Sequence, residues 1–315
     1  MDFTACQENK LYMYGGGNGK KIGITYDGAV YMLKFPPAAR NKTELSYTNS
    51  CISEYISCHI FSSVGIDTQQ TLLGTYRGKV VVACKDFTEG GYELRDFASL
   101  KNTVISSSEE GYGTELVDIL ETIHQQSLLP PEELENAFWE MFLMDAFLGN
   151  FDRHNGNWGF LVNKVLGTVR IAPIYDCGSC LYPQLSEAGM KQVLSSEKEL
   201  ENRMYVFPNA AIKEGNKKIN YFEFLSLTKN RVCIAALKRI IDRIDMGKIG
   251  SIIEHTPYIS ELQKSFYFTV LSLRKYLILE QAMEGRGEKG QNIAKRNLRT
   301  ELDRIDGERR EKWKF

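Results

Sequence analysis

The sequence of 315 residues lacks the features that mark membrane, secreted and nucleic-acid-binding proteins. No apolar run reaches membrane-spanning length, and the first residues, MDFTACQENK, carry no basic segment followed by an apolar one. The formal net charge is only −1, so nothing in the composition favours nucleic acid as the main ligand. We therefore predict a cytoplasmic protein with no transmembrane segment and no direct nucleic-acid partner.

Cysteine and histidine are also sparse. The seven cysteines are an odd number without framework spacing, which favours a reducing compartment over a disulfide-stabilised fold. The pair Cys177 and Cys180 has neither a second cysteine pair nor a thioredoxin-like context, so we expect it to pack around a loop rather than bind zinc or perform redox chemistry. With only four histidines in the chain, we expect His154 to brace a loop rather than bind a metal.

Strand-like and helical patterns occupy different parts of the chain. Residues 11–35 alternate short apolar runs with glycines, and residues 70–87 again resemble strands. Helical spacing covers residues 46–66. Residues 130–150, PPEELENAFWEMFLMDAFLGN, begin with proline and acidic residues and end near Gly149, which are typical signals for the start and end of a helix.

These patterns predict an α+β, bilobed fold. Residues 1–90 would form a small β-rich N-lobe, and residues 91–283 would form a larger helical C-lobe. Residues 284–315 form a charged C-terminal tail. We favour a solvated, partly disordered helix for the tail over a basic segment that binds a partner or an anionic surface.

Residues 148–161, LGNFDRHNGNWGFL, place a polar loop between two apolar segments. Asp152 alone would more often cap backbone groups than perform catalysis. However, the D-x-x-x-x-N spacing from Asp152 to Asn157, followed by Asp-x-Gly at residues 176–178, matches the catalytic and magnesium loops of protein kinases. In that chemistry Asp152 would accept the proton of the attacking hydroxyl. Asn157 and Asp176 would offer the oxygen ligands that Mg²⁺ prefers, so ATP and Mg²⁺ are the expected cofactors.

The N-lobe offers the other residues that a kinase needs. Lys34 ends a strand-like run and would reach the phosphates, and Glu54 on the following helix would hold that lysine. Alone, each would more often be an exposed surface residue, but their order relative to Asp152, Asn157 and Asp176 favours the functional interpretation.

Two further segments of the N-lobe are expected to contact the nucleotide. The glycine-rich stretch YGGGNGKKIGI would cover the phosphates, although a simple hairpin turn is the alternative. It is not a Walker A motif, because Tyr14 and Lys21 occupy positions that the motif reserves for glycine and for serine or threonine. A hinge after the last strand of the lobe would bind adenine. The candidate cofactor-binding residues, besides Lys34, are Gly15, Gly16, Gly17, Asn18, Gly19, Lys85, Asp86 and Phe87.

Together, LGNFDRHNGNWGFL, IAPIYDCGSCLYP, YMLKFPP and SEYISCHI resemble the HipA-like serine/threonine kinases, especially their compact members, over about residues 10–280. The resemblance implies a protein-kinase-like fold, ATP and Mg²⁺ as cofactors, and phosphorylation of serine or threonine on proteins, often on the kinase itself. It also raises the prospect of a bacterial effector or toxin delivered to host cells without a recognisable signal peptide. Some family members are held by a DNA-binding antitoxin. Here the glycine loop starts near residue 15, which leaves no room for the extra N-terminal subdomain of full-length HipA and argues against such a partner.

Two alternatives stay open. Phosphatidylinositol kinases carry a similar D-R-H-x-x-N pattern, but a lipid kinase should present a basic or apolar membrane-facing surface, and none is evident in the sequence. A non-catalytic nucleotide-binding scaffold would usually have lost one of the five polar residues expected of an active kinase, and all five are present.

Overall fold

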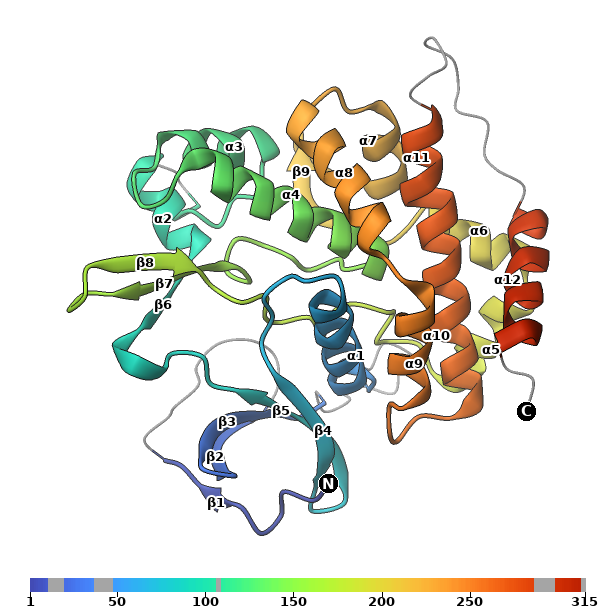
Figure 1. Ribbon diagram of the computed structural model, residues 1–315, viewed down its shortest axis with the longest axis horizontal. Coiled ribbons are helices and arrows are strands. Elements are labelled where there is room, and N and C mark those ends of the chain that lie inside the picture. The colour runs from blue at the N-terminus through green and yellow to red at the C-terminus, as the bar shows by residue number, and fades with distance from the viewer. Residues whose placement is uncertain (11–19, 37–47, 106–108, 286–297, 313–315) are drawn as a thin grey trace.

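The structure is a computed structural model that describes residues 1–10, 20–36, 48–105, 109–285 and 298–312. Its N-terminal part is an antiparallel sheet in the order β1-β2-β3-β5-β4 (Figure 1). The tight turn between β2 and β3 uses Asp27 and Gly28, both with positive φ (47° and 74°), as a two-residue hairpin requires. The strands are β1 (Gln7–Glu8), β2 (Lys21–Tyr26), β3 (Ala29–Lys34), β4 (Thr71–Tyr76) and β5 (Lys79–Lys85).

Helix α1 (Ser50–Ser63) lies between this sheet and the helical part of the molecule (Figure 1). It packs on β4 and β5 on one side and on α9 (Met246–Glu254) on the other. Because α1 contacts protein on both sides, even its residue Glu54 is buried, with 1% of its surface exposed.

A second sheet joins the two parts of the chain. β6 (Glu93–Asp96) pairs with β7 (Gly159–Asn163), and β7 pairs with β8 (Thr168–Ile171) in a hairpin. Gly159 allows the close approach of β6, since a Cβ atom at this position would lie 2.1 Å from the carbonyl oxygen of Arg95. The polar loop lies between α4 and β7. The pairing of β7 with β6 therefore holds the end of this loop against the segment that follows β5 of the N-terminal sheet.

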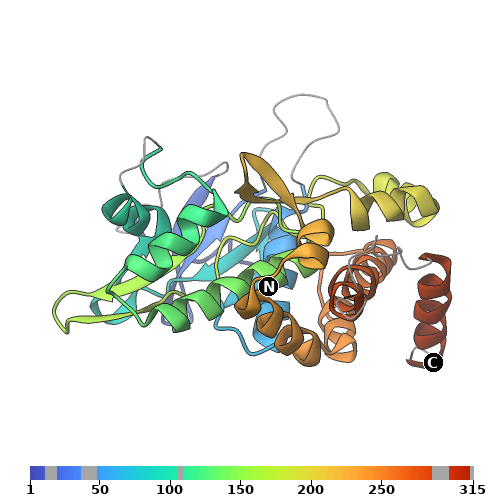
Figure 2. The ribbon, with the colours of Figure 1, turned by 90° about the horizontal axis from the view of Figure 1, so that it is seen from above.

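Helices dominate the rest of the described chain (Figure 2). The long helix α4 (Pro131–Leu148) is buried along most of its length and ends at Gly149, which adopts the left-handed conformation with φ of 69°. The remaining elements are η1 (Glu89–Gly91), α2 (Phe97–Val104), α3 (Leu116–Gln125), α5 (Glu187–Leu194), α6 (Glu197–Tyr205), β9 (Asn209–Glu214), β10 (Lys217–Asn220), α7 (Tyr221–Leu227), α8 (Arg231–Arg243), α10 (Glu261–Arg274), η2 (Lys275–Glu280), α11 (Gln281–Glu284) and α12 (Leu298–Lys312).

The main hydrophobic core is continuous across both parts of the molecule. It includes α1, inner residues of β4 and β5, and the helices around α4, while a smaller cluster fills the other face of the N-terminal sheet. The predicted α+β fold, with a β-rich N-lobe and a larger helical C-lobe, is confirmed. The lobe boundaries at residues 90 and 283 stay predictions, but the shared core shows that the lobes are not packed independently.

The charged tail departs from the expected solvated helix. Part of it forms α12, which packs beside α10 and α6 at the outer edge of the molecule (Figure 2). Leu298 and Ile305 on α12 are 4% and 1% exposed. Leu298, Leu302 and Ile305 are spaced to fall on one side of α12, and this apolar side packs against the core. In the part of the chain that the structure describes, no helix is long and apolar enough to cross a membrane.

Candidate active site

The polar loop begins where α4 ends. Gly149 turns the chain, and the side chain of Asn150 donates to Asp145 Oδ1 at 2.8 Å while accepting from the N–H of Asp152 at 3.0 Å. Asn157 Nδ2 donates to the carbonyl oxygen of Asp152 at 2.8 Å. The two predicted residues Asp152 and Asn157 are therefore held together by the loop's own hydrogen bonds.

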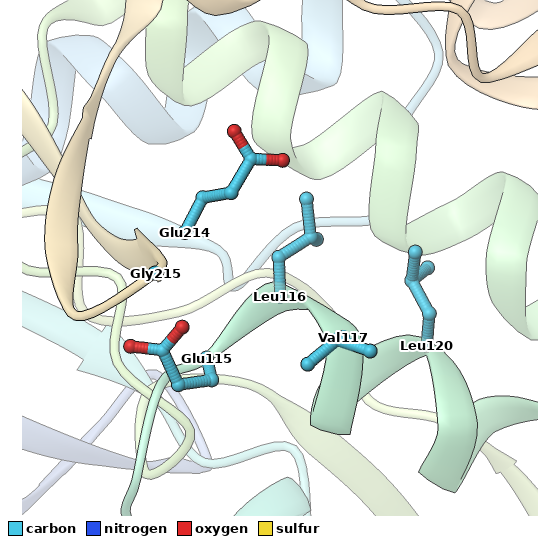
Figure 3. A pocket seen from close by; sticks show the side chains of 6 residues that line it. All are labelled: Glu115, Leu116, Val117, Leu120, Glu214 and Gly215. Atoms are coloured by element: carbon cyan, nitrogen blue, oxygen red, sulfur yellow. The ribbon is translucent and has the colours of Figure 1, made fainter.

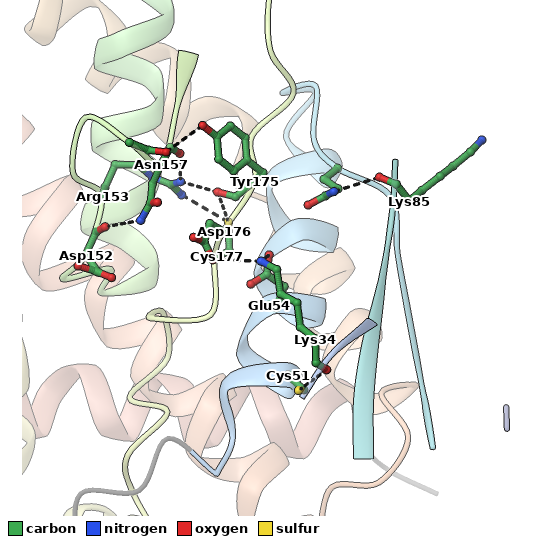
Figure 4. Close-up of polar contacts among 12 residues, drawn as sticks. Lys34, Cys51, Glu54, Lys85, Asp152, Arg153, Asn157, Tyr175, Asp176 and Cys177 are labelled. Atoms are coloured by element: carbon green, nitrogen blue, oxygen red, sulfur yellow. Dashed lines mark hydrogen bonds and ion pairs between the residues drawn. The ribbon is translucent and has the colours of Figure 1, made fainter. Parts of the chain in front are cut away.

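Arg153 fixes this loop to the one that follows β8. Its guanidinium is buried and pairs with Asp145, with Nε 2.9 Å from Oδ2. Nη1 of Arg153 donates to the carbonyl oxygens of Asn157 at 2.8 Å and of Tyr175 at 2.6 Å. Figure 4 shows Arg153 between the two loops. One side chain therefore sets the position of Asn157 relative to Asp176, the residue after Tyr175.

Lys34 joins the N-lobe to the C-lobe. Its Nζ lies 3.0 Å from Glu54 Oε1 on α1 and 3.0 Å from Asp176 Oδ1 (Figure 4). The predicted pair of Lys34 and Glu54 is present, and the contact with Asp176 is an additional one. Asp176 has a positive φ of 57°, a left-handed conformation that aspartate adopts more readily than most residues and that turns the chain sharply at this point.

The charges of the site are unequal. Lys34 holds the pKa of Asp176 down at about 2 against the effect of burial, so this carboxylate is ionised at neutral pH. Burial alone would lower the pKa of Lys34. The nearby carboxylates of Asp176 and Glu54 together have the larger effect, so the pKa of Lys34 is raised. Asp152 behaves differently: although part of the residue is exposed to solvent, desolvation of its carboxylate raises its pKa above 3.8.

The donor atoms fit a divalent cation bound together with phosphate. Asp176 offers an anionic oxygen, and its carboxylate side chain is 42% exposed. Asn157 uses its Nδ2 within the loop, which leaves its amide oxygen as the available ligand atom. Among the described residues, no cluster of three or more His, Cys, Asp or Glu side chains could hold a metal by itself. A hard cation that keeps water and phosphate oxygens in its shell needs only one or two protein ligands.

The candidate hinge lies at the end of β5. The N–H groups of Lys85 and Asp86 already donate to the carbonyl oxygens of Gln70 and Val30, at 2.8 and 2.9 Å. The side chain of Gln69 donates to the Lys85 carbonyl oxygen at 3.0 Å. Lys85 and Asp86 thus have backbone N–H groups engaged within the sheet, so they are poor donors for a base. The ring centroid of Phe87 lies 5.8 Å from that of Tyr175, the residue before Asp176.

The predicted phosphate-covering residues Gly15, Gly16, Gly17, Asn18 and Gly19 lie outside the described residues. The structure also shows the surroundings of His154, Cys177 and Cys180. The side chain of His154 accepts from the N–H of Gly156 at 3.0 Å, inside the catalytic loop. Cys177 and Cys180 are fully buried free thiols that pack behind Asp176.

Sequence reasoning missed Asp145 and Arg153 as a structural unit. Both residues lie in or beside the segment 148–161 and the preceding helix, but no spacing rule connects a helix residue to a loop residue eight positions later. One signal was available: Asp145 interrupts the apolar run FLMDAFL near the end of α4, and a carboxylate on a buried helix needs a cationic partner. Arg153 was the nearest candidate in the chain.

A small cavity lies away from this site. It has a volume of about 330 Å³ and is found between the start of α3 and the turn joining β9 to β10 (Figure 3). No predicted catalytic, nucleotide or metal residue lines it. The lining residues are Glu115, Leu116, Val117, Leu120, Glu214 and Gly215.

Comparison with known proteins agrees with the geometry. Residues 13–246 match the model of the HipA-like C-terminal domain. The chain is 52% identical over 283 residues to the serine/threonine-protein kinase CtkA of Helicobacter pylori strain J99, covering 90% of this chain and 87% of that protein.

Two solved structures are similar in fold. The crystal structure of an H. pylori proinflammatory kinase CtkA superimposes with a TM-score of 0.87 at 50% identity, covering 93% of this chain and 99% of that one. HipA from the toxin–antitoxin complex of Shewanella oneidensis MR-1 with HipB and operator DNA matches with a TM-score of 0.57 at 15% identity, covering 90% of this chain and 69% of that one. The second likeness concerns the fold alone. The chain belongs to the family of HipA-like C-terminal domains, and it is a kinase of the serine/threonine class.

Proposed function

We propose that this kinase transfers the γ-phosphate of Mg²⁺-bound ATP to a serine or threonine hydroxyl of a protein. Asp152 accepts the proton of the hydroxyl, Asn157 and Asp176 bind the cation, and Lys34, held by Glu54, supports the α- and β-phosphates. The observation that carries the proposal is the 3.0 Å contacts of Lys34 with both Glu54 and Asp176, because they bring residues from the two lobes into one site.

The protein's own residues account for the charge and proton changes. The raised pKa of Asp152 makes its carboxylate a better proton acceptor than an ordinary aspartate, while it remains ionised when its pKa lies below the working pH. When bound, the cation would neutralise charge on the phosphates. Arg153 keeps Asn157 and the Asp176 loop at a fixed spacing, so the ligand atoms need little rearrangement.

The nucleotide base is proposed to lie against Phe87 at the end of β5. Phe87 stays the stronger hinge candidate, since the N–H groups of Lys85 and Asp86 are used by Gln70 and Val30. The glycine-rich segment 15–19 is proposed to cover the phosphates, because it precedes β2 and Lys21 of β2 pairs with Lys34 in the sheet.

The test is transfer of labelled phosphate from ATP with and without a generic acceptor protein; labelling without acceptor would reveal autophosphorylation. Asp152→Asn should abolish transfer yet bind Mg·ATP nearly as the parent does, whereas Asp176→Ala should weaken Mg²⁺-dependent nucleotide binding as well. Asp242→Ala removes an exposed carboxylate on α8 and serves as the control. Normal turnover in Asp152→Asn, or unchanged Mg·ATP affinity in Asp176→Ala, would contradict the assigned roles.

A further inference from the structure

The β9–β10 hairpin is fixed to the catalytic loop on two sides. Directly after β10, the hydroxyl of Tyr221 donates to the carbonyl oxygen of Asn150 at 2.6 Å. On the other edge, the N–H of Lys213 donates to the carbonyl oxygen of Thr114 at 2.8 Å. The residue before Thr114 accepts from the side chain of Asn155 at 2.9 Å. The hairpin therefore has a defined position beside the residues that would receive a protein substrate.

Two lysines face each other across this hairpin. Lys213 of β9 and Lys218 of β10 are direct partners in the ladder, and like charges in this position are unfavourable for a sheet. Their neighbours Ile212 and Ile219 are buried, whereas Lys213 is partly exposed and Lys218 is exposed, so both lysines lie on the solvent side of the hairpin. The strands thus keep two positive charges together on an accessible face.

Nearby carboxylates do not neutralise this pair. Glu214 lies opposite Lys217, and the side chain of Glu115 accepts from the N–H of Asn216 at 2.9 Å. Within the described ranges, neither Lys213 nor Lys218 forms an ion pair with an acidic side chain. The pair is therefore available to an anion from outside the chain.

The pair also lies close to the proton acceptor. The hydroxyl of Tyr221, directly after β10, contacts Asn150, and the side chain of Asn150 accepts from the N–H of Asp152 at 3.0 Å. These hydrogen bonds join the end of the strand that carries Lys218 to the loop that carries Asp152. An acceptor hydroxyl at Asp152 would thus have its flanking residues next to Lys218.

We propose that Lys213 and Lys218 bind an acidic side chain next to the acceptor serine or threonine, so that the kinase selects acidic protein segments. The inference rests on the proposed function, because it requires the acceptor hydroxyl to lie at Asp152. Two ammonium groups side by side provide several donors without the fixed geometry of a guanidinium, which suits a carboxylate on a flexible peptide.

The experiment compares two serine peptides that are identical except that glutamates flanking the acceptor are replaced by glutamine. The parent protein and the variant with Lys213→Gln and Lys218→Gln are assayed for kcat and KM at several salt concentrations. Lys217→Gln is the control, since it removes one charge from β10, the strand of Lys218, on the opposite face, whereas the double variant removes one charge from each strand of the hairpin. Phosphate transfer to the glutamine peptide measures the kinase activity independently of any preference for acidic residues.

We expect the parent protein to favour the glutamate peptide by about fivefold in kcat/KM, the size of an exposed charge pair, mainly through a lower KM. The preference should decline as salt rises, disappear in the double variant and persist in Lys217→Gln. Equal kcat/KM for the two peptides in the parent protein would overturn the inference while leaving the kinase function intact. An equal loss of kcat on both peptides in the double variant would also overturn it. If no acceptor at all is labelled, the proposed function fails first, and this inference fails with it.

Discussion

At the scale of single residues, Lys34 is a side chain that connects the two lobes. It belongs to β3, and its ammonium group lies 3.0 Å from the carboxylate of Glu54 on α1 and 3.0 Å from the carboxylate of Asp176 in the loop after β8. A phosphate that binds Lys34 would therefore enter a network that already exists. The sequence could predict Lys34 and Glu54 from their order in the chain, but the contact with Asp176 depends on packing over a separation of 142 residues.

Replacement of Lys34 tests this network. Lys34→Met should lower kcat/KM by orders of magnitude, because it removes a phosphate contact and leaves Glu54 buried without its cation. Lys34→Arg should fail as well, since a planar guanidinium does not reproduce a compact ammonium. Glu54→Gln should be milder, because its amide oxygen still accepts from Lys34. Steady-state kinetics on a peptide substrate decide the order, and a fully active Lys34→Met would mean that Lys20 or Lys21 holds the phosphates instead.

The two aspartates of the site should titrate on opposite sides of the ordinary value of 3.8. Asp176, paired with Lys34, should titrate at about 2, so it stabilises the fold above pH 3.8 and loses that effect as the pH falls through about 2. Asp152 has a raised pKa in the folded protein. Its protonated form therefore stabilises the fold below pH 3.8, and this stabilisation is lost as the pH rises through the pKa of the folded state.

Carbon-13 NMR of the side-chain carboxyl groups measures both titrations in the protein without nucleotide. The variants Asp152→Asn and Asp176→Asn identify the two resonances by their loss. A midpoint for Asp152 below that for Asp176 would show that the charge distribution described for the site is wrong.

At the scale of elements, Arg153 connects helix α4 with the loop that follows it and with the loop that follows β8. The start and end of α4 could be predicted from its proline, its acidic first turn and Gly149, since these are local signals. The ion pair between Asp145 and Arg153 could not be predicted in the same way. It forms because the loop after α4 and the loop after β8 meet at the end of that helix. Similarly, the many charges of the tail hid the apolar spacing of Leu298, Leu302 and Ile305, which pack α12 against the core.

Removal of Arg153 should therefore affect stability and activity together. Arg153→Met leaves Asp145 buried without its cation and frees two carbonyl oxygens, which should lower the free energy of unfolding by about 3–5 kcal/mol. Urea unfolding followed by circular dichroism measures the loss. Arg95→Met is the matched control, because Arg95 pairs with Glu93 at the surface and its removal should change stability little. A similar midpoint for both variants would show that the Arg153 pair contributes little to the fold.

At the scale of the whole molecule, the two lobes share one core. Leu73 and Val82 of the N-terminal sheet belong to the same hydrophobic cluster as α1 and α4. The two-lobe pattern could be predicted from the change between strand-like and helical periodicity, which is a local property. The continuity of the core could not, because it depends on α1 facing β4 and α9 at once.

This shared core predicts a single unfolding transition. Hydrogen exchange followed by mass spectrometry at increasing urea should show that peptides from β4 and β5 and peptides from α4 lose protection at the same denaturant concentration. A fragment of residues 1–90 should not fold alone, since it would expose the face of α1 that contacts α9. Loss of protection in the sheet well before α4 would show instead that the N-lobe is an independent domain.

The fixed position of α1 has a consequence for control of the enzyme. Many protein kinases are regulated by moving the helix that carries the conserved glutamate. Here Asn49, directly before α1, donates through its side chain to the carbonyl oxygen of Leu185 at 2.7 Å, and its N–H donates to that of Pro183 at 3.2 Å. A helix anchored at its start and covered on two sides has little freedom to swing outward. The contact of Lys34 with Glu54 is therefore built by the packing of α1, and movement of α1 would have to break the hydrogen bonds of Asn49 as well as the contacts with β4, β5 and α9.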